Sequence, residues 1–305
     1  TIFYYLHKNY SISSHPEITL EANPDDLTPD YIAMLRTLPF NRLSMGIQTF
    51  NESILKVLQR RHTARQAIEA FQNCRAAGFQ NISIDLMYGL PGETLSTWQQ
   101  DLDQALLLHP EHLSAYHLIY EEDTVLWKLR EQHKVEEADE DLSVSLFSTL
   151  IDRLTSEGYD HYEISNFSLP GLYSRHNSSY WTEKKYLGCG PSAHSYNGVS
   201  RQWNVASLDT YIKGISAGTP VFEIEELDLY TRYNDFVITR IRTEWGMPLS
   251  KLRDEFGEKL YDYCLRMAAP HLKQGTLELV NDILKLTRKG IFISDGIMSD
   301  MLWTD

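Results

Sequence analysis

Short apolar runs alternate with helical segments along the first half of the chain, and this alternation leaves few possible folds. Five such runs have the composition of β-strands, at residues 17–22, 42–48, 82–87, 113–119 and 161–164. Strands that alternate with helices predict a parallel sheet with right-handed crossover connections. Because five strands are too few to close an eight-stranded barrel, we expect an α/β fold in which residues 1–165 form an open or partial barrel.

Helical segments are expected before, between and after these strands. They lie at residues 2–10, up to about 38, from 51 onward, and at 64–77, 96–108 and 142–157. The stretch from Glu121 to Asp141 is acidic and polar, which is typical of a solvated surface excursion.

After residue 165 the pattern changes. Residues 166–224 are rich in Gly, Ser, Asn and aromatic residues, and we expect an irregular connecting region there. Residues 225–305 predict a winged-helix-like α+β domain, with helices at 229–242, 249–256, 260–273 and 294–302 and a hairpin at 277–286. This part carries 14 acidic against 11 basic residues, so a packing or lid role fits it better than DNA binding.

The composition argues against several classes of protein. The formal net charge of −14 is unfavourable for a nucleic-acid binder that works through a basic face. No apolar run reaches the roughly 18 residues of a membrane-spanning helix, and no secretory signal is recognised. Cys74, Cys189 and Cys264 are too scattered for a disulfide framework or a metal loop, which favours a cytoplasmic protein.

The amino terminus has an unusual pattern. The chain begins at Thr1, without a methionine, and residues 2–10 resemble the middle of an amphipathic helix. We therefore expect this chain to be a fragment whose natural amino-terminal part is missing.

Polar residues at the ends of the first three strands form the first candidate site. Glu21, Gln48 and Asp85 come from these ends, and Arg60 comes from the helical region after the second strand. Ligands of parallel α/β folds bind at the carboxyl ends of the strands. Carboxylates accept hydrogen bonds from an ammonium group or ribose hydroxyls, and arginine binds a carboxylate bidentately, so the set suits a zwitterionic ligand with a ribose. The alternative is a set of strand-end caps and surface salt bridges.

The second candidate site is the segment His176-Asn177-Ser-Ser-Tyr180-Trp181. A histidine beside Asn, Tyr and Trp in an irregular segment is suited to ligate heme iron while the aromatic rings stack on a porphyrin. The alternative is a structural histidine, hydrogen-bonded among core aromatic residues.

Two glycine-containing segments have simpler explanations. Residues 89–92, Gly-Leu-Pro-Gly, are accounted for as a strand-to-helix turn. Residues 186–194 contain two glycines and a serine that could cradle an anion, although a tight turn is the simpler interpretation. We expect Cys74 and Cys264 to be buried as small hydrophobic residues and Cys189 to be exposed in its glycine turn.

Five longer motifs carry a family resemblance. They are Glu17-Ile-Thr-Leu-Glu-Ala-Asn-Pro24, Arg42-Leu-Ser-Met-Gly-Ile-Gln48, Ile84-Asp-Leu-Met-Tyr-Gly-Leu-Pro91, Tyr162-Glu-Ile-Ser-Asn166 and Tyr186-Leu-Gly-Cys-Gly-Pro-Ser-Ala-His194. Together, and in this order, they resemble the radical S-adenosylmethionine family of oxygen-independent coproporphyrinogen III oxidases. The resemblance covers essentially the whole chain. The His176–Trp181 segment is similar to the branch of that family regarded as heme chaperones.

This resemblance implies a partial (β/α)6 barrel with a carboxy-terminal winged-helix-like domain. It places Glu21, Gln48, Arg60 and Asp85 at the positions that contact S-adenosylmethionine. It also implies a [4Fe–4S] cluster, held by a Cys-x-x-x-Cys-x-x-Cys loop that is followed by a Gly-Gly-Thr-Pro segment. Both would lie upstream of Thr1, and no cysteine of this chain can replace that loop. The chain as written is therefore expected neither to hold the cluster nor to cleave the cofactor.

The resemblance implies a heme chaperone, with His176, Asn177, Tyr180 and Trp181 around the heme. S-adenosylmethionine and, in the full-length protein, the [4Fe–4S] cluster are the further cofactors, and the expected partner is an unidentified heme-acceptor protein rather than a nucleic acid. The alternative is an oxygen-independent coproporphyrinogen III oxidase acting on a porphyrinogen. In that enzyme a deoxyadenosyl radical abstracts hydrogen from a propionate side chain and triggers oxidative decarboxylation, while the protein orients the cofactor.

Overall fold

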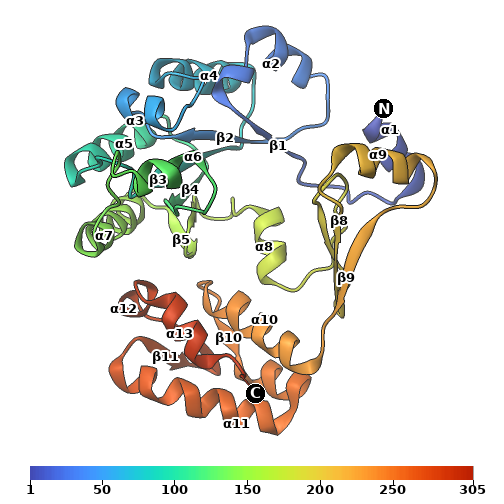
Figure 1. The fold of residues 1–305 in the computed structure, drawn as a ribbon, viewed down its shortest axis with the longest axis vertical. Helices are drawn as coiled ribbons and strands as arrows, with labels where there is room; N and C mark the ends of the chain where they lie inside the picture. Colours follow the sequence, from blue (N-terminus) through green and yellow to red (C-terminus); the bar gives the residue numbers. More distant parts are fainter. Residues whose placement is uncertain (305) are drawn as a thin grey trace. The chain divides into compact units, whose positions relative to one another are not determined.

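The computed structural model describes residues 1–304, which form two compact units (Figure 1). The first unit comprises Thr1–His161 and Ser165–Tyr173. The second comprises Tyr162–Ile164 and the chain from Ser174 onward. Residues 166–224, expected to be a separate connecting region, are thus divided between the two units, and most of them belong with the carboxy-terminal domain.

The first unit is built on a six-stranded sheet in the order β1-β2-β3-β4-β6-β5. Its parallel strands are β1 (Thr19–Ala22), β2 (Arg42–Gln48), β3 (Ile82–Tyr88) and β4 (His112–His117), each paired with the next. The predicted parallel α/β alternation is confirmed for these strands. β5 (Asp160–Glu163), the fifth predicted strand, lies at the edge of the sheet.

One strand of this sheet was not predicted. β6 (Asn166–Ser168) lies between β4 and β5 and runs antiparallel to β4. Three residues are too few to show an alternating pattern, so nothing local marks this strand in the sequence. Its position means that the sheet is not parallel throughout.

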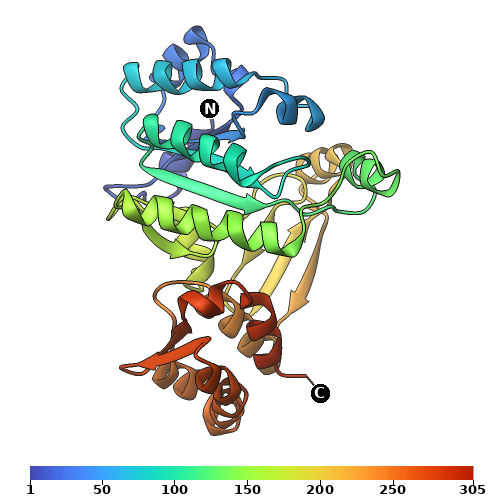
Figure 2. The ribbon, with the colours of Figure 1, turned by 90° about the vertical axis from the view of Figure 1, so that its left-hand side faces the viewer.

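Helices connect the parallel strands at nearly the predicted positions. They are α1 (Ile2–Asn9), the 3₁₀ turn η1 (Pro24–Asp26), α2 (Pro29–Leu35), α3 (Glu52–Val57), α4 (Ala64–Ala76), α5 (Leu95–Leu107), α6 (Val125–Glu131) and α7 (Glu140–Ser156). Only α6, inside the acidic stretch, was not predicted. Helices α5 and α7 lie side by side (Figure 2), and the buried Trp98 indole on α5 donates a hydrogen bond to Leu146 O on α7, 3.0 Å away.

The two faces of the parallel sheet differ in chemistry, because successive side chains of a strand point to opposite faces. One face is apolar, with each side chain 0–1% exposed: Leu43, Met45, Ile47, Ile82, Ile84, Leu86, Leu113 and Ala115. The other face is polar and consists of two rows of register partners, Glu21-Ser44-Ser83-His112 and Gly46-Asp85-Ser114. The apolar face supplies the burial that stabilises the sheet, while the polar face is available for a site.

The second unit begins with a short helix and an antiparallel sheet. Helix α8 (Arg175–Trp181) comes first, and β7 (His194–Tyr196), β8 (Ser200–Asn204) and β9 (Phe222–Glu226) pair in that order, with α9 (Leu208–Ser216) between β8 and β9. The prediction of an irregular region over 166–224 is therefore wrong. These strands have three to five residues and many polar side chains, so they lack the apolar alternation that predicts a strand.

The remainder of the second unit is the predicted winged-helix-like domain. Its elements are α10 (Leu229–Ile241), β10 (Met247–Pro248), α11 (Leu249–Gln274), β11 (Leu277–Val280), β12 (Ile283–Leu286), α12 (Arg288–Ile291) and α13 (Ser294–Met301). The two helices predicted at 249–256 and 260–273 are the two halves of α11, which is broken at Gly257, where φ is 79°.

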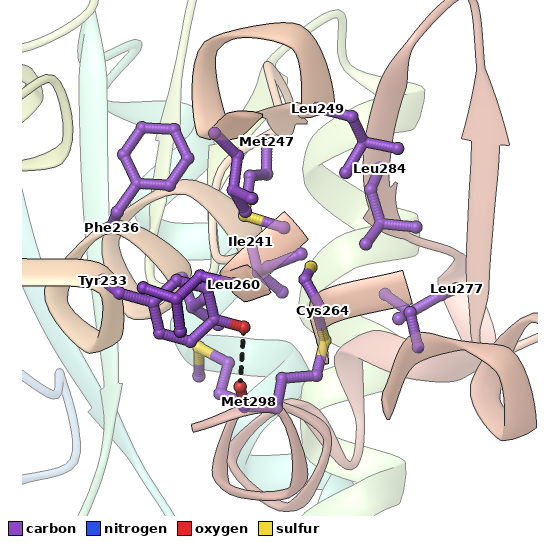
Figure 3. Packing of buried hydrophobic residues seen from close by; sticks show 14 of the residues in the cluster. Tyr233, Phe236, Ile241, Met247, Leu249, Leu260, Cys264, Leu277, Leu284 and Met298 are labelled. Carbon is purple, nitrogen blue, oxygen red and sulfur yellow. Dashed lines mark hydrogen bonds between the residues drawn. The ribbon is translucent and has the colours of Figure 1, made fainter. Parts of the chain in front are cut away.

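The core of this domain is apolar and closely packed (Figure 3). Tyr233 and Phe236 of α10 lie fully buried in it, together with Met247 and Leu284 from the strands. The Tyr233 hydroxyl donates to Met301 O at 3.1 Å, so this buried polar group has a partner. Cys264 also lies in this core, and burial raises the pKa of its thiol to about 12. Among the other cysteines, Cys74 is buried and Cys189 is exposed, so all three predictions are confirmed.

Candidate cofactor and heme sites

The structure brings Gln48 and Arg60, two of the predicted strand-end residues, together around Gly46. Gln48 ends β2, and Arg60 follows α3. A Cβ atom built on Gly46 would lie 2.9 Å from Gln48 Nε2 and 3.5 Å from Arg60 Nη2. Arg60 Nη2 donates to Gly46 O at 2.8 Å and to Asn23 Oδ1 at 2.7 Å. Arg60 Nε is buried and has no hydrogen-bond partner among the described residues, so the guanidinium keeps a donor for a ligand.

Gln48 has an unusual backbone conformation. Its φ is 71°, in the left-handed region that residues other than glycine seldom occupy. The register between β2 and β3 shifts between Gly46 and Gln48, which marks a β-bulge at this strand end. Such bulges re-aim side chains next to functional sites. No sequence pattern indicated this bulge, since the apolar run continues up to Ile47.

The two predicted carboxylates, Glu21 and Asp85, lie on either side of Ser44. Glu21 is the register partner of Ser44, and the Ser44 hydroxyl lies 3.4 Å from both Asp85 carboxylate oxygens. Burial is the main reason that the pKa of Asp85 rises from 3.8 to about 6; the negative charge of Glu21 adds to the rise, and the hydroxyl of Ser114 opposes it. The prediction that these side chains share one edge of the sheet therefore agrees with the structure. We call Glu21, Gln48, Arg60 and Asp85 the polar edge.

Two further buried carboxylates near this edge were not predicted. Glu93 accepts hydrogen bonds from Gly89 N at 2.7 Å and Leu90 N at 3.3 Å, and burial raises its pKa to about 7. Asp101 accepts from Thr49 Oγ1 at 2.5 Å and from Phe50 N at 2.9 Å, and burial raises its pKa to about 6. Both carboxylates fix the turns that follow β3 and β2. This agrees with a structural explanation of the Gly-Leu-Pro-Gly segment.

His176 lies exposed on α8, a helix capped at its amino end by Ser174 Oγ, which accepts from Asn177 N at 3.3 Å. The segment is thus helical, not irregular as predicted, and His176 is not among core aromatic residues. Tyr180 follows one turn later on the same side, and its hydroxyl shares a 2.9 Å hydrogen bond with His176 Nε2. The two rings meet edge to face with centroids 5.0 Å apart.

Asn177 and Trp181 are half-buried neighbours on the same helix. The Arg242 guanidinium lies 4.3 Å from the centre of the Trp181 ring, a cation–π contact. The indole Nε1 of Trp181 is buried and has no hydrogen-bond partner among residues 1–304. His176 and Tyr180 are therefore in contact with each other, whereas the Trp181 ring packs against Arg242.

The glycine segment at residues 186–194 is a tight turn and not an anion cradle. Gly188 N donates to Ser195 Oγ at 3.0 Å, and Gly190 N donates to the Tyr211 hydroxyl at 2.9 Å. A Cβ on Gly188 would lie 2.1 Å from His194 O, so no larger residue fits there. Because both N–H groups already have partners, the segment offers no cradle to an anion.

A pocket of about 490 Å³ lies beside α8 within the second unit. Tyr180 and Trp181 line it, and so do aromatic and charged residues that the sequence did not single out: Lys184, Tyr186, Tyr196, Arg201, Arg232 and Lys251. Its volume is in the range of small-molecule sites. These residues come from α8, β7, β8, α10, α11 and the loop after α8, so no local motif could have predicted the pocket.

Similarity to known proteins agrees with this architecture. Residues 2–105 match the Radical SAM superfamily, and residues 227–293 match the HemN C-terminal domain. The heme chaperone HemW of Bacillus subtilis is 30% identical over 287 residues, which cover 94% of this chain and 76% of that protein. HemW of Lactococcus lactis is 32% identical over 292 residues, covering 95% and 76%, respectively. The chain belongs to the HemW family.

A solved structure shows the same fold as this HemW-family chain. Coproporphyrinogen III oxidase (HemN) from Escherichia coli, a radical SAM enzyme, superposes with a TM-score of 0.82 at 22% identity. The match covers 98% of this chain and 73% of that one. The predicted radical-SAM fold with a carboxy-terminal α+β domain is thus confirmed.

Membership of the radical SAM superfamily implies S-adenosylmethionine and an iron–sulfur cluster. The polar edge fits S-adenosylmethionine, since it offers carboxylate, amide and guanidinium groups. The Nε atom of the Arg60 guanidinium has no hydrogen-bond partner among the described residues. Within residues 1–304, no three His, Cys, Asp or Glu side chains come together to hold a metal ion, so we assign no residue of this chain to the cluster. Among the helices of residues 1–304, none combines the length and the hydrophobicity of a membrane-spanning segment.

Proposed function

We propose that this HemW-family protein is a heme chaperone that binds heme through His176 and delivers it to an acceptor protein. The observation that carries the proposal is the position of His176, exposed on α8 and joined through Tyr180 to an aromatic pocket. An imidazole on the surface of a helix is accessible to heme iron, and an exposed ligand suits a protein that must also release its heme. HemW relatives that are at least 30% identical support the assignment.

We further propose that the polar edge holds S-adenosylmethionine. Glu21 and Asp85 would accept hydrogen bonds from its ribose hydroxyls or its ammonium group, and Arg60 would bind its carboxylate. The positive charge of the ligand would favour ionised Asp85, whose pKa is raised in the free protein. The chemistry that this cofactor supplies belongs to the cofactor itself; the residues of this chain would bind and orient it.

A hemin titration tests the heme assignment. The chain should bind hemin saturably with a low-spin spectrum, and His176→Ala should abolish that spectrum. His133→Ala, which removes an exposed histidine of the first unit, is the matched control and should leave the spectrum unchanged. Bound heme should then pass to an excess of apomyoglobin. A low-spin spectrum that persists in His176→Ala would contradict the assignment of the ligand.

A further inference from the structure

The pocket beside α8 has an aromatic wall whose residues are joined by backbone hydrogen bonds and ring contacts. Tyr186 and Tyr196 form an isolated antiparallel bridge, with both N–O distances 3.0 Å, and their ring centroids lie 6.0 Å apart. The Tyr180 ring meets the Tyr186 ring edge to face at 4.9 Å. Three adjoining phenol rings provide an apolar surface for a planar ligand, each with a polar tip.

The charged residues of the same pocket are only partly paired with one another. Arg201 forms an ion pair with Asp235, and Lys251 lies 2.6 Å from Glu183 and 3.5 Å from Glu255. These pairs account for all the acidic residues that line the pocket. Two cations, Lys184 and Arg232, have no ion pair or side-chain hydrogen bond with any described residue, although Arg232 lies 5.8 Å from the Phe256 ring. We call this site, defined by Tyr186, Tyr196, Lys184 and Arg232, the basic pocket.

The chain has 42 acidic against 28 basic residues, so acidic side chains are abundant. Within residues 1–304, none of them forms an ion pair with Lys184 or Arg232, although both cations line the pocket. Two free cations beside a wall of tyrosines are complementary to a flat aromatic ligand that carries carboxylates. A heme or porphyrin with two propionates has this chemistry.

We propose that the basic pocket binds the carboxylate side chains of the tetrapyrrole, with Arg232 and Lys184 as their partners. This inference rests on the proposed heme-binding function and deepens it, since it assigns the recognition of the ligand's periphery separately from that of its iron. Tyr180 connects the two parts, because its ring lines the pocket while its hydroxyl contacts His176 Nε2. The pocket would thus distinguish a tetrapyrrole with free carboxylates from one whose carboxylates are blocked.

Hemin and hemin dimethyl ester, which lacks free carboxylates, are the probes for this proposal. The unmodified chain should bind hemin about tenfold more tightly than the diester, as expected for loss of a charge-assisted pair. The double variant Arg232→Ala/Lys184→Ala should bind hemin about as weakly as the diester, and its affinity for the diester should not change. Arg266→Ala, an exposed arginine of α11 outside the pocket, is the control and should keep the preference for hemin.

The outcomes separate this inference from the function on which it rests. If the unmodified chain binds no hemin, or if His176→Ala binds it with the same spectrum, the proposed function fails. If hemin binds through His176 but the unmodified chain does not prefer it to the diester, only the basic pocket is overturned. That measurement needs no variant and therefore does not depend on the folding of the double variant. A preference for hemin that persists in a folded double variant would also overturn the pocket.

Discussion

The polar edge of the first unit and the basic pocket of the second use charge in opposite ways. At the polar edge, Asp85 is partly buried, has hydroxyl partners and lies close to a second carboxylate, and desolvation raises its pKa to about 6. In the basic pocket, burial acts in the same direction on Glu183, but hydrogen bonds from Lys251 and Arg240 outweigh it, and the pKa of Glu183 falls below its ordinary value. The polar edge thus has two carboxylates against one guanidinium, whereas the lining of the pocket has four basic residues against three acidic ones.

This difference matches the ligands proposed for the two regions. S-adenosylmethionine carries a sulfonium and an ammonium group, so a site with incompletely compensated carboxylates gains by binding it. Heme carries propionates, so a pocket with unpaired cations gains by binding it. A net charge summed over the whole chain conceals both local fields, since each ligand senses only the charges within about a Debye length.

The largest effect is expected for Arg60→Ala, which removes the one guanidinium that bonds both Asn23 and Gly46 at the polar edge. Because it breaks two partly buried, charge-assisted hydrogen bonds, the free energy of unfolding should fall by about 2–3 kcal/mol. Binding of S-adenosylmethionine should weaken at least about tenfold, because the variant loses a charge-assisted contact with the ligand and about 1.4 kcal/mol corresponds to a factor of about ten. Urea unfolding and calorimetric titration measure the two effects.

Arg61→Ala is the matched control for this variant. The Arg61 side chain is 65% exposed and pairs with Asp25 and Asp26 on the surface, so its removal should change stability very little. Equal effects of the two substitutions would show that Arg60 has no special role at the polar edge.

Asp85→Asn should stabilise the unliganded protein at pH 7.5. The folded-state pKa of about 6 lies above the ordinary 3.8, so the stability that Asp85 contributes is fully present below pH 3.8 and lost as the pH rises through 6. An uncharged amide avoids this loss, and we expect a gain of about 1–3 kcal/mol at pH 7.5 that disappears near pH 4. Urea unfolding at both pH values checks it; a variant less stable at pH 7.5 would contradict a raised pKa.

Glu183→Gln should have the opposite sign in the second unit. Its folded-state pKa is lowered, so its contribution to stability is present above the ordinary value of 4.5 and lost as the pH falls through the lower, folded-state value. The substitution should therefore destabilise the protein at pH 7 by about 1 kcal/mol, since Glu183 is only partly buried. The same unfolding series measures it, and a difference that grows toward acid pH would be inconsistent with this sign.

Tyr180→Phe should have the smallest effect. It should act through His176, the proposed ligand of the heme iron. The Tyr180 hydroxyl is hydrogen-bonded to His176 Nε2, and heme iron that binds this nitrogen would have to displace the hydroxyl. Removing one neutral hydrogen bond of about 0.5–1 kcal/mol should strengthen hemin binding by about threefold. A hemin titration of the variant measures this. Weaker binding would instead indicate that the hydroxyl helps to hold the ligand.

Much of the first unit could be predicted because its strands are buried on an apolar face. The bounds of β2 agree with the sequence-based prediction, and those of β3 differ by one residue, since continuous apolar runs bordered by turn residues leave few alternatives. β6 and the β7-β8-β9 sheet were missed because they are short and largely polar. Their stability comes from pairing with strands distant in sequence, and no window of local sequence contains that information.

The amino-acid sequence was sufficient to predict which chemical groups lie at the strand ends, the family motifs and the order of the main elements. Local residue patterns encode these directly, as the capping Thr63 and Gln66 of α4 illustrate. Three features arise only in the folded chain: Gln48 lies against Gly46, Asp85 is partly buried near Glu21, and Arg232 has no anionic partner within residues 1–304. A pKa and an ion pair depend on through-space distance and on exclusion of water, which arise only when distant segments are packed together.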